Sequence, residues 1–167
     1  LYGGDLTVEQ TVTNTDHSST MPFSIGAHPG FHTPLETEKY SIQIDGLEEP
    51  VRHLIENGIY TGEMEMLETH SGNRIDLCDA LFESDAIVFK QAGISSICIL
   101  EDNIPLVKLY VETETPYWGV WKKPGAPFLC LEPWWGIADH ANASGVLTEK
   151  EGMMHLNAGA SQTFTYK

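Results

Sequence analysis

Apolar and polar side chains alternate along much of this chain with a period of two residues. In residues 6–13, Leu6, Val8 and Val12 share one face, and polar side chains occupy positions 7, 9, 11 and 13 on the other. This alternation is typical of a β-strand that packs on one side. Residues 163–166 repeat the pattern, so we predict a half-buried strand near each end of the chain.

Other stretches are apolar on both faces, which predicts strands buried between two layers. They are residues 86–89, 94–100, 106–111 and 127–131. Further strand-like runs occupy residues 21–25, 40–44 and 117–121. Turn-forming pairs such as Asn57-Gly58 separate the runs. Helical spacing is weak, with single turns expected only around residues 81–84 and 148–152.

Many short strands at fairly even spacing predict an all-β fold, an antiparallel β-sandwich or supersandwich. The 167 residues suffice for one core and contain no internal repeat, so we expect a single domain over residues 1–167. No run of about 18 apolar residues occurs, which argues against a membrane-spanning helix.

The formal net charge of −15 changes the range of functions to consider. Such a field repels nucleic-acid phosphates and anionic membranes, although a simple solubility charge explains it as well. Cys78, Cys98 and Cys130 are odd in number and form no CxxC motif, which argues against a disulfide scaffold or a zinc site. Free thiols are typical of a reducing compartment, so we predict a cytoplasmic protein.

The alternating strand pattern stops near His28, which lies between small residues and Pro29. The proline restricts the histidine backbone to extended conformations, and the neighbouring glycines allow a ligand to approach closely. From this segment alone, a structural or merely exposed histidine remains the more common case. His32 lies four residues further on, but Pro29 and Gly30 argue against a helix between them, so we predict no metal site.

A second candidate is Glu132, which an apolar strand delivers directly before Pro133, Trp134 and Trp135. Burial beside apolar surface raises the pKa of a carboxylate and makes it a better base near neutrality. Tryptophan faces can also pack against the C–H groups of a sugar ring. A salt-bridged glutamate beside core tryptophans fits the segment equally well.

A third candidate is Asp85, which opens the apolar run of residues 86–89. Its carboxylate could accept hydrogen bonds from sugar hydroxyls, but a turn-forming aspartate is the more common explanation of such a position. No serine has the context of a nucleophile elbow, and no GxxxxGKS phosphate loop occurs.

Taken together, these segments resemble the aldose 1-epimerase (galactose mutarotase) family, with the LacX-like branch as the nearest likeness. The likeness extends over nearly the whole chain, and its motifs come in the family's order. It rests on Asn14 and on residues 21–31, 81–89, 119–125, 130–139, 149–152 and 156–166. The His-Pro and Glu-Pro-Trp motifs are fairly specific as a pair, and each alone would be weak.

The resemblance implies a sandwich of large twisted antiparallel sheets, and interconversion of the α and β anomers of a hexose such as galactose or glucose. No metal or cofactor is implied. His28 corresponds to the family's general acid and Glu132 to its general base. Asp85 corresponds to the aspartate that binds sugar hydroxyls, and Trp121 and Trp134 lie in segments that line the cleft.

Family members are longer, and the resemblance implies that this chain corresponds to roughly their C-terminal half to three-fifths, without the segment that supplies a second active-site histidine and an arginine. Three alternatives stay open: a non-catalytic carbohydrate-binding module, a hexose-6-phosphate mutarotase that would need clustered Arg or Lys, and a structural protein without ligand. The sequence leaves open the identity of the sugar, the anomer preference and a homo-oligomeric state.

Mutarotation requires proton transfer at two oxygens of the sugar. We therefore expect His28 and Glu132 on opposite sides of one pyranose, about one ring apart and not in direct contact. We also expect a bell-shaped dependence of the rate on pH.

Overall fold

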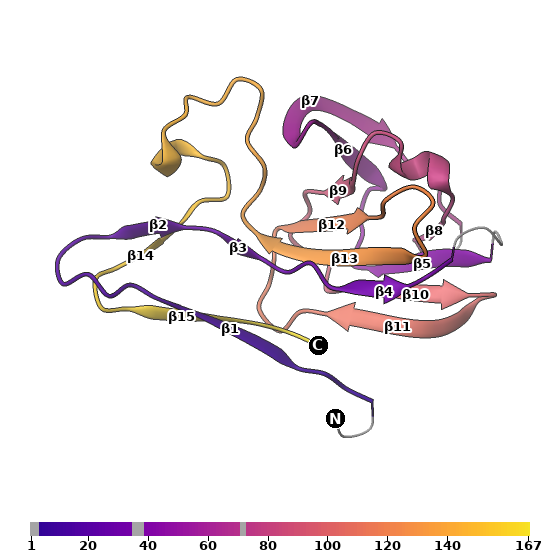
Figure 1. Cartoon of the computed structure of the whole chain (residues 1–167), viewed down its shortest axis with the longest axis horizontal. Helices are drawn as coiled ribbons and strands as arrows, with labels where there is room; N and C mark the ends of the chain where they lie inside the picture. The colour runs from indigo at the N-terminus through magenta and orange to yellow at the C-terminus, as the bar shows by residue number, and fades with distance from the viewer. Residues whose placement is uncertain (1–3, 35–38, 71–72) are drawn as a thin grey trace.

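Two β-sheets stacked on one another form the larger part of the molecule, and two narrow ribbons extend to one side (Figure 1). The computed structural model describes residues 4–34, 39–70 and 73–167. Within these residues every pairing between named strands is antiparallel, and no α-helix is present. The prediction of an all-β antiparallel sandwich is therefore confirmed.

The elements are short, as the spacing of the turn residues predicts. The strands of the first half are β1 (Val8–Thr13), β2 (Met21–Phe23), β3 (Ile25–Gly26), β4 (Gly30–His32), β5 (Tyr40–Asp45), β6 (Val51–Glu56), β7 (Ile59–Met66) and β8 (Arg74–Asp76). Those of the second half are β9 (Ile87–Phe89), β10 (Ser96–Glu101), β11 (Ile104–Tyr110), β12 (Tyr117–Trp121), β13 (Phe128–Trp135), β14 (Met154–Leu156) and β15 (Ser161–Tyr166). Two 3-10 turns are η2 (Asp79–Phe82) and η3 (Leu147–Glu149).

The larger sheet has seven strands in the order β3-β13-β12-β9-β6-β7, with β4 also paired to β13. The second sheet has the order β11-β10-β5-β8. The core lies between the two sheets, and its fully buried side chains come from both of them. They include Ile42, Ile97 and Ile99 of the smaller sheet and Phe89, Trp118, Val120, Leu129 and Leu131 of the larger one.

The other face of the seven-stranded sheet carries a second, smaller apolar cluster. It includes Ile55, Tyr60, Val88 and Tyr117, with Trp134 packed against it. Because side chains alternate between the faces of a strand, β12 and β13 supply residues to both clusters. This second face is the one that carries the candidate site.

The position of β11 differs from its prediction. The apolar run of residues 106–111 was expected in a strand buried on both faces, but β11 is the edge strand of the smaller sheet. Ile104 and Leu106 are exposed, as is Leu6, which lies outside β1. An apolar run thus predicted strand structure correctly without indicating whether the strand is central or at an edge.

The two ribbons join the ends of the described chain. β1 pairs with β15 along its whole length, and β2 pairs with β14. Asn14 is buried at their junction and donates hydrogen bonds from Nδ2 to the carbonyls of Ser19, at 2.8 Å, and Leu156, at 2.9 Å. Among the residues described, no helix has the length and apolar character needed to cross a membrane.

Candidate active site

The candidate site is organised by β13, which carries two short strands along one of its edges. Gly26 of β3 lies opposite Trp134, and Gly30 of β4 lies opposite Cys130. The two pairings share one antiparallel register, although the ladder is interrupted between them. The residues midway between these pairs therefore face each other across the two chain segments.

His28 and Glu132 are these midway residues. Backbone hydrogen bonds on either side hold the segments together, from the Ala27 amide to the Pro133 carbonyl at 3.0 Å and from the Leu131 amide to a carbonyl of the facing segment at 3.2 Å. Two distant motifs therefore meet as cross-strand neighbours, which explains why their side chains converge on one spot.

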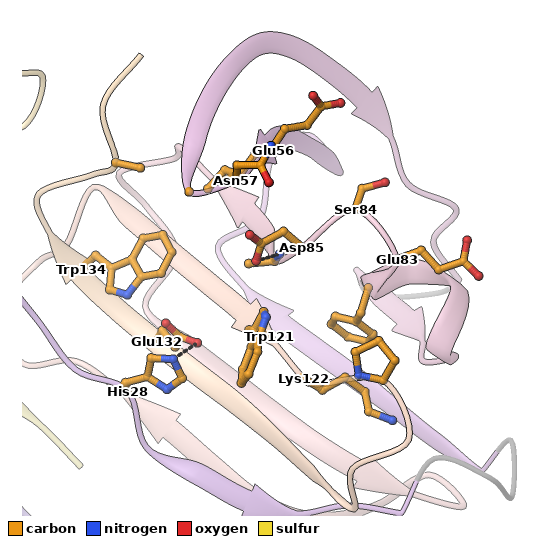
Figure 2. Close-up of a pocket in the computed structure, with 16 residues that line it drawn as sticks. His28, Glu56, Asn57, Glu83, Ser84, Asp85, Trp121, Lys122, Glu132 and Trp134 are labelled. Carbon is orange, nitrogen blue, oxygen red and sulfur yellow. Dashed lines mark hydrogen bonds and ion pairs between the residues drawn. The ribbon is translucent and has the colours of Figure 1, made fainter. Parts of the chain in front are cut away.

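The imidazole of His28 is in direct contact with the carboxylate of Glu132 (Figure 2). Nε2 and Oε1 are 3.2 Å apart, with the histidine side chain 59% exposed and the glutamate side chain 3% exposed. The contact lacks hydrogen-bond geometry, and Oε1 has no hydrogen-bond partner among the described residues. Glu132 is thus a buried carboxylate with little local compensation for its charge.

The pKa of Glu132 is raised to about 7, chiefly by burial; the indole N–H of Trp134 lowers this pKa and the negative charge of Asp85 raises it, each by a smaller amount. The predicted effect of burial on this carboxylate is confirmed. Burial also raises the pKa of the neighbouring Cys130 thiol to about 11. A carboxylate with a pKa near 7 is suited to exchange protons at neutral pH.

The pair lies at the floor of a cleft of about 890 Å³, a size typical of small-molecule sites. Its lining includes all five residues singled out in the sequence, His28, Asp85, Trp121, Glu132 and Trp134. In Figure 2, Trp134 and Trp121 border the pair on either side, and Asp85 faces it across the open space. The structure therefore brings these five residues together, while their individual roles stay predictions.

Trp134 is held close to the sheet by two glycines. A Cβ added at Gly119 would lie 2.6 Å from Cζ2 of the indole, and one added at Gly26 would lie 2.8 Å from Cδ1. Gly119 also lies directly opposite Glu132 on β12. The absence of side chains at these two positions lets the indole lie beside the carboxylate, a requirement that the sequence analysis missed for Gly119.

The indole of Trp121 contacts the ring of His28 edge to face, with centroids 5.7 Å apart and planes inclined by 74°. Such an arrangement is favourable for aromatic rings and limits the rotation of an otherwise exposed imidazole. Trp121 also packs against Phe128, at 6.0 Å between centroids. We infer that Trp121 positions His28 as well as bordering the cleft.

Asp85 combines the two interpretations that the sequence left open. Its backbone has φ of +89°, a left-handed conformation that costs free energy for a residue with a side chain. Its Oδ1 accepts a hydrogen bond from the amide of Ala86 at 2.8 Å, as in a turn-forming aspartate. The same residue lines the cleft, so the turn places the carboxylate at the cleft surface.

Five further polar residues line the cleft and were not predicted as site residues. They are Glu56 and Asn57 at the β6–β7 hairpin, Glu83 and Ser84 after η2, and Lys122 after β12. The Asn57-Gly58 turn was recognised, but nothing in its pattern indicated that the hairpin bends over the site. Lys122 is buried and forms an ion pair with Asp79.

The expected separation of the acid and the base by the width of a ring is wrong for this structure. The physical reason is the shared register of β3 and β4 along β13. His28 and Glu132 face each other as cross-strand neighbours, so their side chains emerge side by side. The contact at 3.2 Å thus replaces the expectation of opposite sides.

One group of possible metal ligands occurs among the described residues, and it differs from the pair considered in the sequence. It consists of His28, Cys130 and Glu132, with one ligand atom from each lying within 4.8 Å of the others. His32 is not part of it. The three cysteines are free, and Cys98 and Cys130 are buried as predicted.

Known proteins were found with similar sequences and similar folds. No family model matches the sequence. The chain is 27% identical to the plasmid-encoded protein LacX of Lactococcus lactis subsp. lactis, over 90% of this chain and 52% of that protein. The chromosomal LacX of the same organism gives the same identity and coverage.

Two solved structures extend this likeness to three dimensions. A galactose mutarotase-like protein from Lactobacillus casei ATCC 334 superimposes with a TM-score of 0.85 and 27% identity, over 100% of this chain and 59% of that one. A galactose mutarotase related enzyme from Lactobacillus acidophilus superimposes with a TM-score of 0.78 and 26% identity, over 96% of this chain and 57% of that one. The resemblance to LacX and to galactose mutarotase-like proteins is confirmed, and the chain spans about half the length of the curated relatives it matches.

Proposed function

We propose that this chain carries the acid–base pair of an aldose 1-epimerase, which interconverts the α and β anomers of a free hexose. The observation that carries the proposal is the Glu132 carboxylate. It is buried, has a pKa of about 7, touches the imidazole of His28, and lies at the floor of a cleft between two tryptophans. The galactose mutarotase-like fold of the chain supports the same reaction class.

In the proposed mechanism, ionised Glu132 accepts the proton of the anomeric hydroxyl while protonated His28 donates a proton to the ring oxygen. The bond between C1 and the ring oxygen breaks, and the open-chain aldehyde forms. Rotation about the C1–C2 bond presents the other face of the carbonyl. Ring closure returns the proton from Glu132 to the new anomeric hydroxyl and restores the proton on His28, so no net proton is consumed.

The direct contact of the two groups has a consequence for substrate binding. The sugar oxygens must insert between Nε2 of His28 and Oε1 of Glu132, which are 3.2 Å apart without ligand. His28 is more than half exposed and makes no side-chain hydrogen bond to the residues that the structure describes, so it is the more mobile of the two groups, within the limits that the contact with Trp121 sets. We expect the imidazole to turn toward the ring oxygen on binding, while Glu132 stays fixed in the sheet.

The charge of the cleft favours a neutral hexose over a phosphorylated one. Glu56, Glu83, Asp85 and Glu132 all contribute carboxylates. Among the described lining residues, Lys122 is the one lysine or arginine, and Asp79 already neutralises it. A phosphate would therefore meet net repulsion where a phosphosugar site needs clustered positive charge.

The experiment is polarimetry on freshly dissolved α-galactose and α-glucose, with the spontaneous relaxation subtracted. We expect the chain to accelerate relaxation, and Glu132→Gln to abolish the acceleration while sugar binding persists. Glu63→Gln, which alters an exposed carboxylate of β7 outside the cleft lining, is the matched control and should keep the rate. A Glu132→Gln protein with near-normal catalysis would refute the assignment.

A second candidate, a carbohydrate-binding module without catalysis, is favoured by the direct contact of the two groups, which leaves no space for a sugar oxygen in the ligand-free state. The same measurement separates the two functions. A binder would leave the relaxation rate at its spontaneous value while titration calorimetry still detects the sugar.

A further inference from the structure

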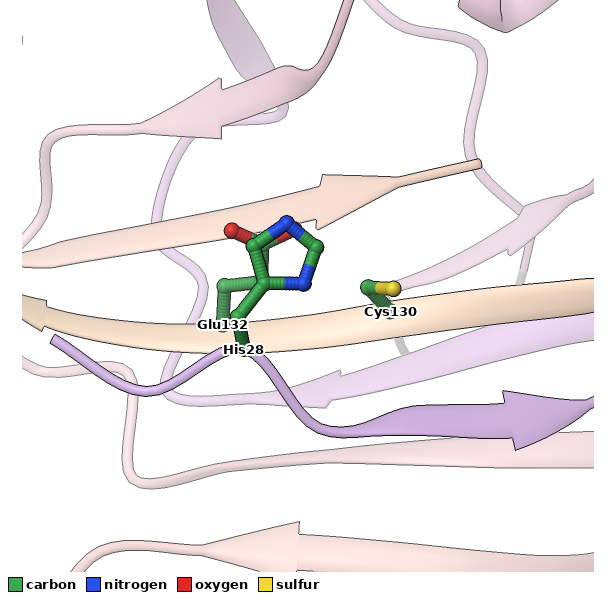
Figure 3. A group of neighbouring side chains, drawn as sticks. All are labelled: His28, Cys130 and Glu132. Atoms are coloured by element: carbon green, nitrogen blue, oxygen red, sulfur yellow. The ribbon is translucent and has the colours of Figure 1, made fainter. Parts of the chain in front are cut away.

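Three side chains with different donor atoms lie near one another beside β13 (Figure 3), two of them in the cleft lining and the third, Cys130, buried next to it. Cys130 and Glu132 are two residues apart on β13, so they project from the same face of the strand. His28 lies beside Glu132 from the facing segment, as the register requires. One nitrogen, one sulfur and one oxygen thereby come within 4.8 Å of one another.

The oxygen in this group lacks a hydrogen-bond partner. Oε1 of Glu132 is buried and accepts no hydrogen bond from the described residues, and its contact with His28 is poorly directed. Buried carboxylate oxygens normally receive donors or a cation, because burial without them is costly. This oxygen points toward the imidazole and is therefore available to a positive ion.

The donor set indicates which ion would be accepted. Imidazole, thiolate and carboxylate together are ligands of zinc and similar borderline ions, whereas magnesium and calcium prefer oxygen ligands alone. Zinc bonds of about 2.0–2.3 Å in a tetrahedron place neighbouring ligand atoms roughly 3.3–3.7 Å apart. The 3.2 Å between His28 and Glu132 is close to this spacing.

Because the three donor atoms lie within 4.8 Å of one another, the sulfur needs to move by no more than about 1–1.5 Å to complete such a tetrahedron. Gly30 of β4 lies opposite Cys130 and has no side chain to cover it, and even an added Cβ would stay 3.5 Å from Sγ. Trp121 lies opposite Cys130 on β12, so the room for a change of the thiol rotamer lies on the side of Gly30.

We propose that His28, Cys130 and Glu132 form a binding site for one zinc ion, with a fourth coordination position open toward the cleft. Coordination replaces the thiol proton by the metal and releases that proton to solvent. The ion occupies the position between the two groups that mutarotation requires, so zinc acts as an inhibitor that excludes the sugar. The binding step is independent of the proposed function, and only the inhibition rests on it.

The binding step is tested with cobalt(II) as a spectroscopic substitute for zinc, followed by displacement with zinc. We expect one ion per chain, a thiolate-to-cobalt charge-transfer absorption, and loss of that absorption when zinc is added. Cys130→Ser should abolish the absorption and weaken zinc binding by more than tenfold, whereas Cys78→Ser, at an exposed cysteine, should change neither. Absorption that persists in Cys130→Ser, or disappears in Cys78→Ser, would overturn the proposal.

A second measurement uses the unmodified chain alone and therefore does not depend on whether a variant folds. Zinc should raise the melting temperature of the unmodified chain, because it binds the native state, and magnesium at the same concentration should not. No zinc-dependent shift would also overturn the site. Inhibition is measured as the ratio of mutarotation rates with EDTA and with zinc. A chain without mutarotase activity but with the cobalt absorption would refute the proposed function and leave the metal site standing.

Discussion

The substitution Glu132→Gln should change how the stability of the fold depends on pH. Glutamine has nearly the same shape as glutamate and carries no charge. It therefore removes the titration of a buried carboxylate while keeping its packing between β12 and the segment around His28. The variant isolates a single ionisation from the many acidic groups of a chain with net charge −15.

The magnitude follows from the two pKa values of the carboxyl group. In the folded chain the pKa is raised to about 7, against 4.5 for an ordinary glutamate. The difference is about 2.5, and at about 1.36 kcal/mol per pKa unit it corresponds to about 3 kcal/mol.

The sign is set by which state holds the proton. Between pH 4.5 and about 7 the folded state keeps the Glu132 proton, while the unfolded chain has lost it. The free energy of unfolding therefore falls as pH rises through this window. This is opposite to a salt-bridged carboxylate with a lowered pKa, whose contribution grows with pH.

The assay is urea unfolding of the unmodified chain and of Glu132→Gln at pH 5 and pH 8. We expect the stability of the unmodified chain, relative to the variant, to fall by about 2.5 kcal/mol over this interval. For Glu83→Gln, at an exposed position, the free energy of unfolding should change with pH in the same way as for the unmodified chain. Parallel pH profiles for the unmodified chain and Glu132→Gln would refute the assignment of a raised pKa.

Four further substitutions test the surroundings of the pair, the last two as a comparison with each other. Asp85→Asn keeps the backbone conformation and the acceptor for the Ala86 amide, so unfolding in urea should change by less than about 0.5 kcal/mol. Calorimetry should show sugar binding about tenfold weaker, and unchanged binding would contradict a role in holding the sugar. Gly119→Ala places a Cβ 2.6 Å from the Trp134 ring and should destabilise the fold by about 1–3 kcal/mol while reducing the mutarotation rate; a neutral effect on both would show that the close approach is not required. Asp79→Ala leaves buried Lys122 without its counter-charge and should lower the free energy of unfolding by about 3 kcal/mol. Lys122→Met removes the buried charge itself and should lower it less; urea unfolding that finds Lys122→Met the less stable variant would contradict this account.

The strands that periodicity predicts best are those with apolar side chains on both faces. β9 and β13 each begin within one residue of their expected starts, and β12, expected as a strand-like run, occupies the residues expected for it. β7 was missed because its sequence is mostly exposed and polar, with methionines that do not face a core. The apolar run at β11 was assigned to the interior, since local sequence carries no information about which strands lie at a sheet edge.

The candidate site was predictable as a set of residues and not as a geometry. Unusual residue types at the expected strand ends pointed to His28, Asp85 and Glu132, and the family resemblance grouped them. Glu132 in fact lies within β13, which continues to Trp135. The contact between His28 and Glu132 depends on a shared register of β3 and β4 along β13, which is a property of the assembled sheet. The same long-range pairing places Cys130 beside them.

The dependence of kcat/KM on pH, with α-galactose as substrate, tests the central claim most directly. This parameter reports the ionisations of the free protein. If buried Glu132 is the base, activity should rise with pH through an apparent pKa of about 7. An acidic limb near 4.5, the value for an ordinary glutamate, would contradict the account.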